Sequence, residues 1–127
     1  MPKNFENKFH HNKDFLDSIV NDYPDQFFDW KVTIQFYCGL HKSYTVLLTQ
    51  GYSIENRHKL NIENLSKIKK SISQNIFKLY KYSRQSRYEG FITQEHMERF
   101  NKINFSSGRV ILKQVESECC EFYPVTV

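Results

Sequence analysis

The sequence predicts an all-α protein, a bundle of four or five helices in an up-down arrangement, and three observations support this. Apolar residues recur at helical spacing along most of the chain, whereas a strand-like pattern is confined to a brief tail at residues 122–125. A chain of 127 residues can bury one modest core, so a single domain over residues 1–127 is expected. Alanine is absent and 16% of the residues are aromatic, so large side chains must fill that core.

Two helices are predicted in the first half of the chain. The first ends at Pro24, because proline cannot continue a helix, and the second spans residues 28–50 with Gly51 as its stop. The apolar positions of the first are Phe15, Leu16, Ile19, Val20 and Tyr23, with Phe5 and Phe9 as an extension. The stripe expected to face the core in the second consists of Trp30, Ile34, Tyr37, His41, Tyr44 and Leu48.

Two further helices are predicted in the second half. Residues 53–65 are a polar stretch that is either a loop or a short helix, and one of the two helices follows it. The apolar positions of this helix run continuously through Leu65, Ile68, Ile72, Ile76 and Leu79 into Ser83. The last helix begins after Gly90, where Thr93 can cap it and Glu95 suits the positive end of its dipole. Its apolar positions are Met97, Phe100, Ile103, Val110 and Ile111. Residues 106–108, Ser-Ser-Gly, mark either a close crossing with another helix or a weak point.

Composition and charge exclude several classes of protein. No apolar run approaches the roughly 18 residues of a membrane-spanning helix, and the polar start lacks the apolar core of a secretory signal. The net charge of +4 is compatible with RNA or DNA but is low for a dedicated binder. The three cysteines lack metal-ligand spacing, so free thiols in a reducing cytoplasm are expected, with no metal and no cofactor.

Two histidines are candidates for function. His41 lies within an apolar, aromatic stripe, so its ring must find a hydrogen-bond partner. It is either a core histidine that ties two helices together or part of a site. The neighbouring Tyr37 and Tyr44, one turn away on either side, are candidate packing residues for the same reason. Arg57 and His58 are adjacent in the polar connection, where they can bind phosphate or transfer protons, or simply face solvent.

The segment Ser83-Arg84-Gln85-Ser86-Arg87-Tyr88 is the most informative part of the chain. On a continuing helix, Arg84 and Arg87 lie one turn apart and share a face with Tyr80. Two guanidinium groups beside tyrosine rings suit a phosphate or carboxylate and can support base stacking. The alternative is that these arginines form ion pairs with Asp29 or Glu89 and fix the helix ends.

The order of these motifs resembles that of bacterial HEPN-domain proteins. The matching elements are Asp29-Trp30, then Phe-Tyr-Cys-Gly-Leu-His at residues 36–41, then Arg57-His58, then Ser-Arg-Gln-Ser-Arg-Tyr at residues 83–88. The resemblance covers most of the chain, from about Asp29 through the last helix. It implies a four- to five-helix bundle that often dimerises through a helical face.

The resemblance also implies a link to RNA and nucleotides. Many family members are ribonucleases of toxin or antiviral systems, and others partner a small nucleotidyltransferase. The nucleases carry an arginine followed four to six residues later by histidine, whereas here Arg57 and His58 are adjacent and Arg87 precedes His96 by nine positions. The positions carried over as a polar cluster are Tyr37, His41, His58, Arg84, Arg87 and Tyr88.

Three functions remain open at this point. The leading hypothesis is a cytoplasmic binding module that lacks the nuclease motif and is not expected to be an active nuclease. It holds the phosphates of a nucleotide or RNA with Arg84 and Arg87, while His41 and His58 close the site. The second is a metal-independent RNase with a composite site in a homodimer, in which His58 is the candidate general base. The third is a structural bundle that binds a partner protein, in which the arginines and histidines brace the helices.

Overall fold

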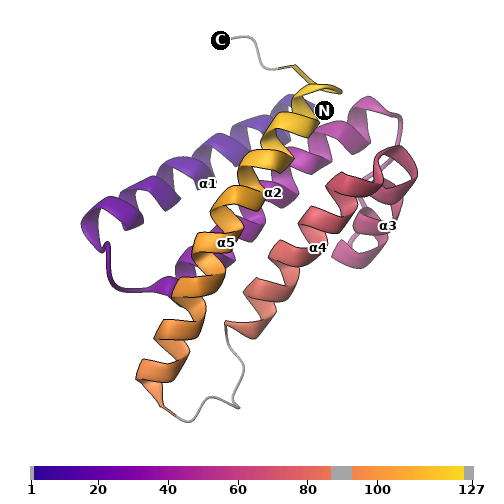
Figure 1. The fold of residues 1–127 in the computed structure, drawn as a ribbon. Helices are drawn as coiled ribbons and strands as arrows, with labels where there is room; N and C mark the ends of the chain where they lie inside the picture. Colours follow the sequence, from indigo (N-terminus) through magenta and orange to yellow (C-terminus); the bar gives the residue numbers. More distant parts are fainter. Residues whose placement is uncertain (1, 87–92, 125–127) are drawn as a thin grey trace.

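The computed structural model describes residues 2–86 and 93–124, and α-helix is the only regular secondary structure within these ranges. The five helices are α1 (Pro2–Asp22), α2 (Phe28–Thr49), α3 (His58–Ile68), α4 (Lys70–Gln85) and α5 (Gln94–Cys120). The predicted all-α bundle is therefore confirmed. The long helices alternate in direction, so that the start of α1 and the end of α5 lie at the same end of the molecule (Figure 1).

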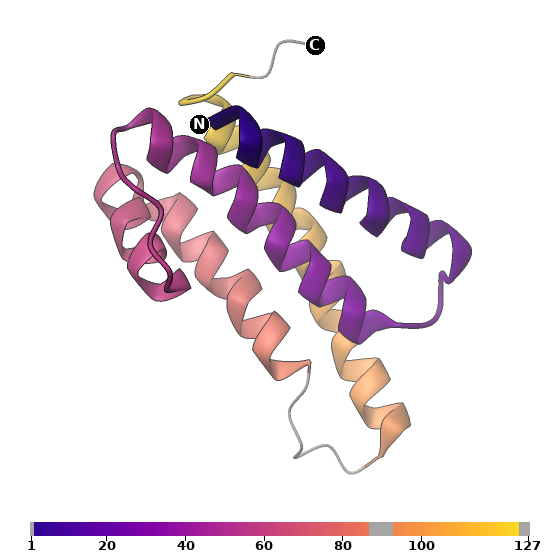
Figure 2. The ribbon, with the colours of Figure 1, turned by 180° about the vertical axis from the view of Figure 1, so that it is seen from behind.

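The central element is α2, which contacts each of the other four helices. Seen from behind, α2 runs between α1 on one side and α3 and α4 on the other, with α5 beyond it (Figure 2). Sixteen of its 22 residues are buried. The expectation of one inward stripe was therefore wrong in part: Trp30 is 53% exposed and Tyr37 is 38% exposed, because the core surrounds α2 on other faces.

Buried hydroxyl groups on α2 bond to the helix itself. The Thr33 hydroxyl donates to the Asp29 carbonyl oxygen at 2.9 Å, and the Ser43 hydroxyl donates to the Leu40 carbonyl oxygen at 2.7 Å. These bonds satisfy polar groups that have no access to water. The helix ends at Thr49, and Gly51 follows with φ of 88°, a left-handed conformation that glycine adopts without strain.

The first helix extends much further toward the N-terminus than its most apolar part suggests. It begins at Pro2, and its buried residues are Glu6, Phe9 and Leu16. Phe15 and Tyr23, expected to be apolar contacts, are 52% and 48% exposed. The extension holds because α1 packs along α2, where the Glu6 carboxylate accepts two 3.0 Å hydrogen bonds from the Lys42 ammonium.

The predicted continuous helix after residue 65 is two helices. The chain becomes extended at Lys69, with φ of −152°, so that α3 folds back against α4. The Ser73 hydroxyl donates to the Ile62 carbonyl oxygen across this junction at 2.9 Å. The Lys69 ammonium lies 3.3 Å from Glu118 and 2.9 Å from Glu121. Tertiary contacts thus stabilise a break that carries no glycine or proline.

The last helix is capped as expected, but much of its buried face was not predicted. The Thr93 side chain accepts a hydrogen bond from the His96 backbone N–H at 3.0 Å. Ile103 and Val110, expected inside, are each 62% exposed. The buried positions are Asn101, Phe105, Gly108, Ile111, Leu112, Val115 and Cys119.

Gly108 marks the close crossing that was one of the two alternatives for residues 106–108. A Cβ atom at this position would lie 1.9 Å from Oε1 of the buried Gln35 on α2. The Gln35 amide group donates to the Phe105 carbonyl oxygen at 3.2 Å. The missing side chain therefore lets α5 approach α2 closely.

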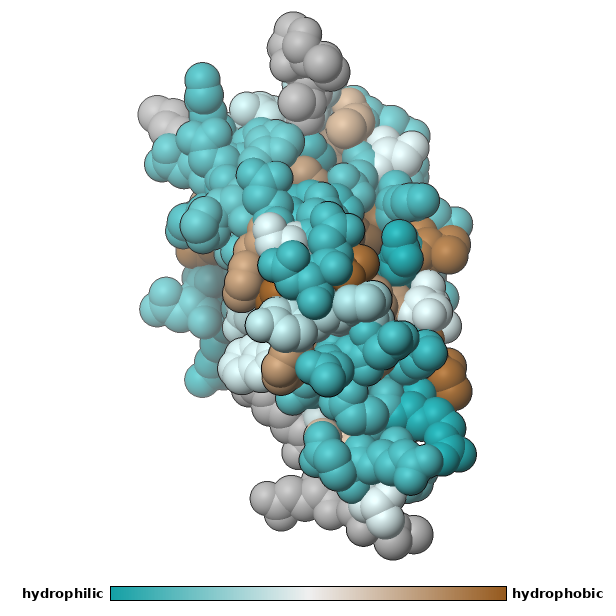
Figure 3. Space-filling model, turned by 90° about the vertical axis from the view of Figure 1, so that its left-hand side faces the viewer, coloured by the Kyte–Doolittle hydropathy of each residue, from teal (hydrophilic) through white to brown (hydrophobic). Residues whose placement is uncertain are grey.

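The remaining surface is mixed. One face of the molecule shows mainly hydrophilic side chains, with pale and hydrophobic ones gathered among them (Figure 3). Across residues 2–86 and 93–124, no helix has both the length and the apolar character needed to cross a membrane. Cys38, Cys119 and Cys120 are free thiols, as predicted.

Candidate functional site

Three of the predicted site residues lie together on the side of α2 that faces away from α5. Tyr37 and His41 project from α2, and His58 is the first residue of α3. The Tyr37 ring lies 6.0 Å from the His41 ring and 6.1 Å from the His58 ring, centroid to centroid. We call Tyr37, His41 and His58 the aromatic platform. Tyr37 is exposed, and both imidazoles are partly exposed.

His41 has a hydrogen-bond partner, but it remains part of the surface. Its Nδ1 atom lies 2.9 Å from the Asn12 amide nitrogen of α1. Because an amide NH₂ group can only donate, Nδ1 accepts and Nε2 carries the proton of the neutral ring. Burial, then the charges of Lys8 and His58, lowers the pKa of His41 from 6.5 to about 4. At neutral pH His41 therefore offers an N–H donor and no positive charge.

His58 is oriented by a short chain of hydrogen bonds. The Asn61 amide donates to the Tyr44 hydroxyl oxygen at 2.8 Å, and that hydroxyl lies 3.3 Å from His58 Nδ1. Asn61 itself is fixed, because its oxygen accepts from the Glu55 backbone N–H at 2.8 Å. With Asn61 as the donor to Tyr44, the Tyr44 hydroxyl donates onward to His58. His58 Nε2 then points away from this chain.

Arg84 is connected to the platform only indirectly, through the rings of Tyr80 and Phe36. Its guanidinium group donates to the Tyr80 hydroxyl at 3.1 Å, and the Tyr80 ring lies 5.4 Å from the Phe36 ring. Phe36 in turn contacts His58, with ring centroids 5.7 Å apart. The predicted shared face of Tyr80 and Arg84 is confirmed. Within the described ranges no ion pair joins Arg84 to Asp29.

Two predicted residues lie outside the described residues, namely Arg87 and Tyr88, and so does Glu89. The rim of the platform is nevertheless basic. Lys8 lies 4.9 Å from the centroid of the Phe5 ring, which packs 5.9 Å from the His41 ring. Arg57 precedes His58 and is exposed. A lysine thus lies beside a partly exposed ring, and an arginine directly precedes His58; cations next to aromatic rings are typical of proteins that bind single-stranded nucleic acids.

Sequence reasoning missed the two asparagines that orient the imidazoles. Asn61 lies three residues after His58, so helical spacing alone places it on the same face of α3. Asn12 gave no comparable signal, because its contact with His41 depends on the register of α1 along α2. Tyr44 was recognised only as a packing neighbour of His41.

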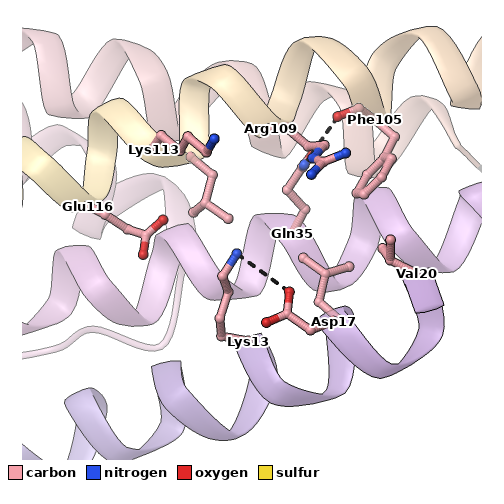
Figure 4. A pocket seen from close by; sticks show the side chains of 10 residues that line it. Lys13, Asp17, Val20, Gln35, Phe105, Arg109, Lys113 and Glu116 are labelled. Carbon is pink, nitrogen blue, oxygen red and sulfur yellow. Dashed lines mark hydrogen bonds and ion pairs between the residues drawn. The ribbon is translucent and has the colours of Figure 1, made fainter.

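Apart from the aromatic platform, the molecule has a hollow between α1 and α5, with α2 at its base (Figure 4). It encloses about 70 Å³, and Lys13 lies 3.7 Å from Asp17 at its edge. Its charged and polar lining residues are Lys13, Asp17, Gln35, Arg109, Lys113 and Glu116. Burial raises the pKa of Glu116, against the effect of nearby lysines. Because cations and carboxylates alternate here, the platform suits a phosphate-bearing ligand better.

In the part of the chain that the structure describes, no three His, Cys, Asp or Glu side chains gather as ligands for a metal ion. Comparisons with protein-family models, with curated proteins and with solved structures gave no match to this chain.

Proposed function

We propose that this protein is an HEPN-like helical module that binds RNA or a nucleotide on the aromatic platform. The observation that carries the proposal is the exposed Tyr37 ring, flanked by two imidazoles whose Nδ1 atoms are already engaged. A base stacks on such a ring, and the two outward Nε2–H groups donate to its acceptor atoms. The five-helix bundle and the order of the motifs support the same proposal.

The basic rim supplies the phosphate contacts in this proposal. Arg84 is exposed, and among the described residues its hydrogen bond goes to the Tyr80 hydroxyl and to no carboxylate, so its charge is available to a phosphate. His41 acts as a donor to the base rather than as a cation. A nucleotidyltransferase-type partner and a homodimer remain proposals that rest on the HEPN resemblance.

Binding to a fluorescein-labelled 12-nucleotide single-stranded RNA, measured by anisotropy, tests this function. Tyr37→Ala should weaken binding about 5- to 150-fold, because base stacking contributes roughly 1–3 kcal/mol. Replacing Arg84 and Arg87 together should weaken binding and reduce its salt dependence. Arg109→Ala, which removes an exposed arginine of α5, is the matched control and should change little. Equal losses in the control and the Tyr37 variant would contradict the proposal.

A second candidate function is RNA cleavage, and the oriented His58 favours it. In this mechanism His58 Nε2 accepts the proton of a ribose 2′-hydroxyl, and the 2′-oxygen attacks the adjacent phosphorus, where Arg84 stabilises the phosphorane charge. The bond from phosphorus to the 5′-oxygen then breaks, the 5′-oxygen takes a proton from water, and a 2′,3′-cyclic phosphate is left. For Nε2 to accept the 2′-hydroxyl proton, the His58 ring must carry its own proton on Nδ1, and Nδ1–H then donates to the Tyr44 hydroxyl oxygen. Incubation of labelled RNA with the wild type and with His58→Ala decides the question. Cleavage that persists in the variant would exclude His58 as the base.

A further inference from the structure

Large apolar side chains lie exposed where α1 turns into α2. We call this surface the turn groove, and the residues that line it are Phe15, Ile19, Tyr23, Phe27 and Trp30. The four aromatic side chains among them are 43–53% exposed. In Figure 1 this connection lies on the left, and Figure 3 views the molecule from that side. Contiguous apolar surface of this kind commonly marks an interaction site.

The backbone of the turn holds one of these rings outward in a strained conformation. Phe27 has φ of 59° and ψ of 37°, and it is the one non-glycine residue with positive φ among those described. Such a conformation is unfavourable for a residue with a Cβ atom. The buried Lys31 ammonium stabilises the turn, because it donates to the Tyr23 carbonyl oxygen and lies 4.3 Å from the Phe28 ring centroid.

The turn groove adjoins an acidic groove, and Phe27 and Trp30 form the wall that they share. The carboxylates of the acidic groove are Asp25, Asp29, Glu95 and Glu98. Among the described cations nearby, Arg99 lies 3.3 Å from Glu95, Lys31 is buried beneath the turn, and the exposed Lys102 lies 5.9 Å from the Phe28 ring centroid. Within residues 2–86 and 93–124, no ion pair engages the carboxylates of Asp25, Asp29 and Glu98, although the chain as a whole carries a net charge of +4.

We propose that the turn groove and its acidic edge bind an amphipathic helix of a partner protein, one whose apolar face is flanked by lysine or arginine. Apolar side chains of that helix fill the turn groove, and its cations meet Asp25, Asp29 and Glu98. A second copy of this chain fits less well, because a two-fold pairing would bring identical acidic edges together. An anionic membrane is repelled for the same reason.

Trp30 is the only tryptophan in the chain, so its fluorescence reports directly on the groove. The probes are two 18-residue tryptophan-free helical peptides with the same leucine face, one with lysine and one with glutamate at the flanking positions. The lysine peptide should shift Trp30 emission to shorter wavelength, protect it from acrylamide quenching, and bind about tenfold more tightly than the glutamate peptide. Binding of both peptides equally, or of neither, would overturn the proposal.

Single-residue variants distinguish a loss of binding at the turn groove from a loss of the fold. Phe27→Gly removes the ring at a position where glycine has no strain, so the variant should fold normally, by circular dichroism, yet bind the lysine peptide at least about fivefold more weakly. Asp29→Lys should weaken that binding also, whereas Val110→Ser and Glu63→Lys, at exposed positions on α5 and α3, should not.

The other occupants give distinct results. A dimer in sedimentation that Phe27→Gly abolishes would assign the groove to a second copy and overturn the proposal. A shift of Trp30 emission with neutral phosphatidylcholine vesicles, but not with the lysine peptide, would assign it to lipid and overturn it equally.

Discussion

Two polar stripes on α2 differ in how their partners are arranged. Gln35 and Lys42 lie seven residues apart on a closed side, where Gln35 bonds to α5 and Lys42 bonds to α1. Tyr37 and His41 lie on an open side, where each imidazole of the platform has one nitrogen engaged and remains partly exposed. On the closed side water cannot replace a lost partner, whereas on the open side it can. Polar residues of one helix can therefore serve the fold or a ligand, depending on access to water.

The largest expected effect comes from breaking the buried ion pair on the closed side. Glu6→Ala leaves the Lys42 ammonium, whose side chain is 3% exposed, without its carboxylate. We expect a loss of about 3–5 kcal/mol in the free energy of unfolding, measured by urea denaturation. Replacing both residues, Glu6→Leu with Lys42→Met, should restore most of the stability, since no charge is then buried.

The matched control on the same helix is Asp17→Ala, which removes the exposed Lys13–Asp17 pair. Exposed pairs contribute little, so its effect should stay below about 1 kcal/mol. A Glu6→Ala variant no less stable than this control would show that Lys42 reaches water, and the distinction between closed and open sides would fail.

The second prediction concerns the close crossing of α2 and α5. Gly108→Ala places a methyl group against Gln35, and displacement of Gln35 breaks its bond to the Phe105 carbonyl oxygen. We expect a net loss of about 1–3 kcal/mol, although alanine favours the helix by roughly 1 kcal/mol. Adding Gln35→Ala should remove the clash, so the double variant should be more stable than the sum of the single effects predicts. Strict additivity in thermal unfolding would contradict the contact.

The third prediction concerns His41 on the open side and how the stability of the protein changes with pH. The unfolded chain protonates His41 near pH 6.5, but the folded chain does so only near pH 4. The unfolded state therefore binds more protons between these values, and stability is lost as the pH falls from about 7 to about 4. Because the ring is partly exposed, the expected contribution is only about 1 kcal/mol. His41→Gln should flatten this part of the profile, while His11→Gln at an exposed position should not.

The sequence was sufficient for the fold class, because apolar spacing and the signals at Gly51 and Thr93 are local. It was insufficient to predict which face of each helix is buried. Asn101 and Gly108 lie in the core, so counting apolar residues selected Ile103 and Val110 instead. A polar or small residue is buried only when a particular neighbour accommodates it, and that neighbour is distant in sequence.

In the candidate site too, contacts within one helix could be predicted from spacing, whereas contacts between helices could not. The contact of Tyr80 with Arg84 spans one helical turn and could be predicted. The approach of His58 to Tyr37 was expected only from the family resemblance, because no local spacing determines how α3 packs beside α2. Contacts within a helix are determined by spacing, whereas contacts between helices depend on the whole arrangement.

The smallest expected effect on stability is that of Arg84→Ala, and it separates binding from bracing. If the arginine braced the bundle, its removal would lower the melting temperature. Its guanidinium group is exposed, however, and its bond to Tyr80 lies within one helix, so we expect a change below about 0.5 kcal/mol. Calorimetry of this variant beside Arg99→Ala, which removes another exposed arginine with a contact one turn away, provides the comparison. A large loss confined to Arg84→Ala would make the arginine part of the fold and would remove the main reason to place a phosphate beside the platform.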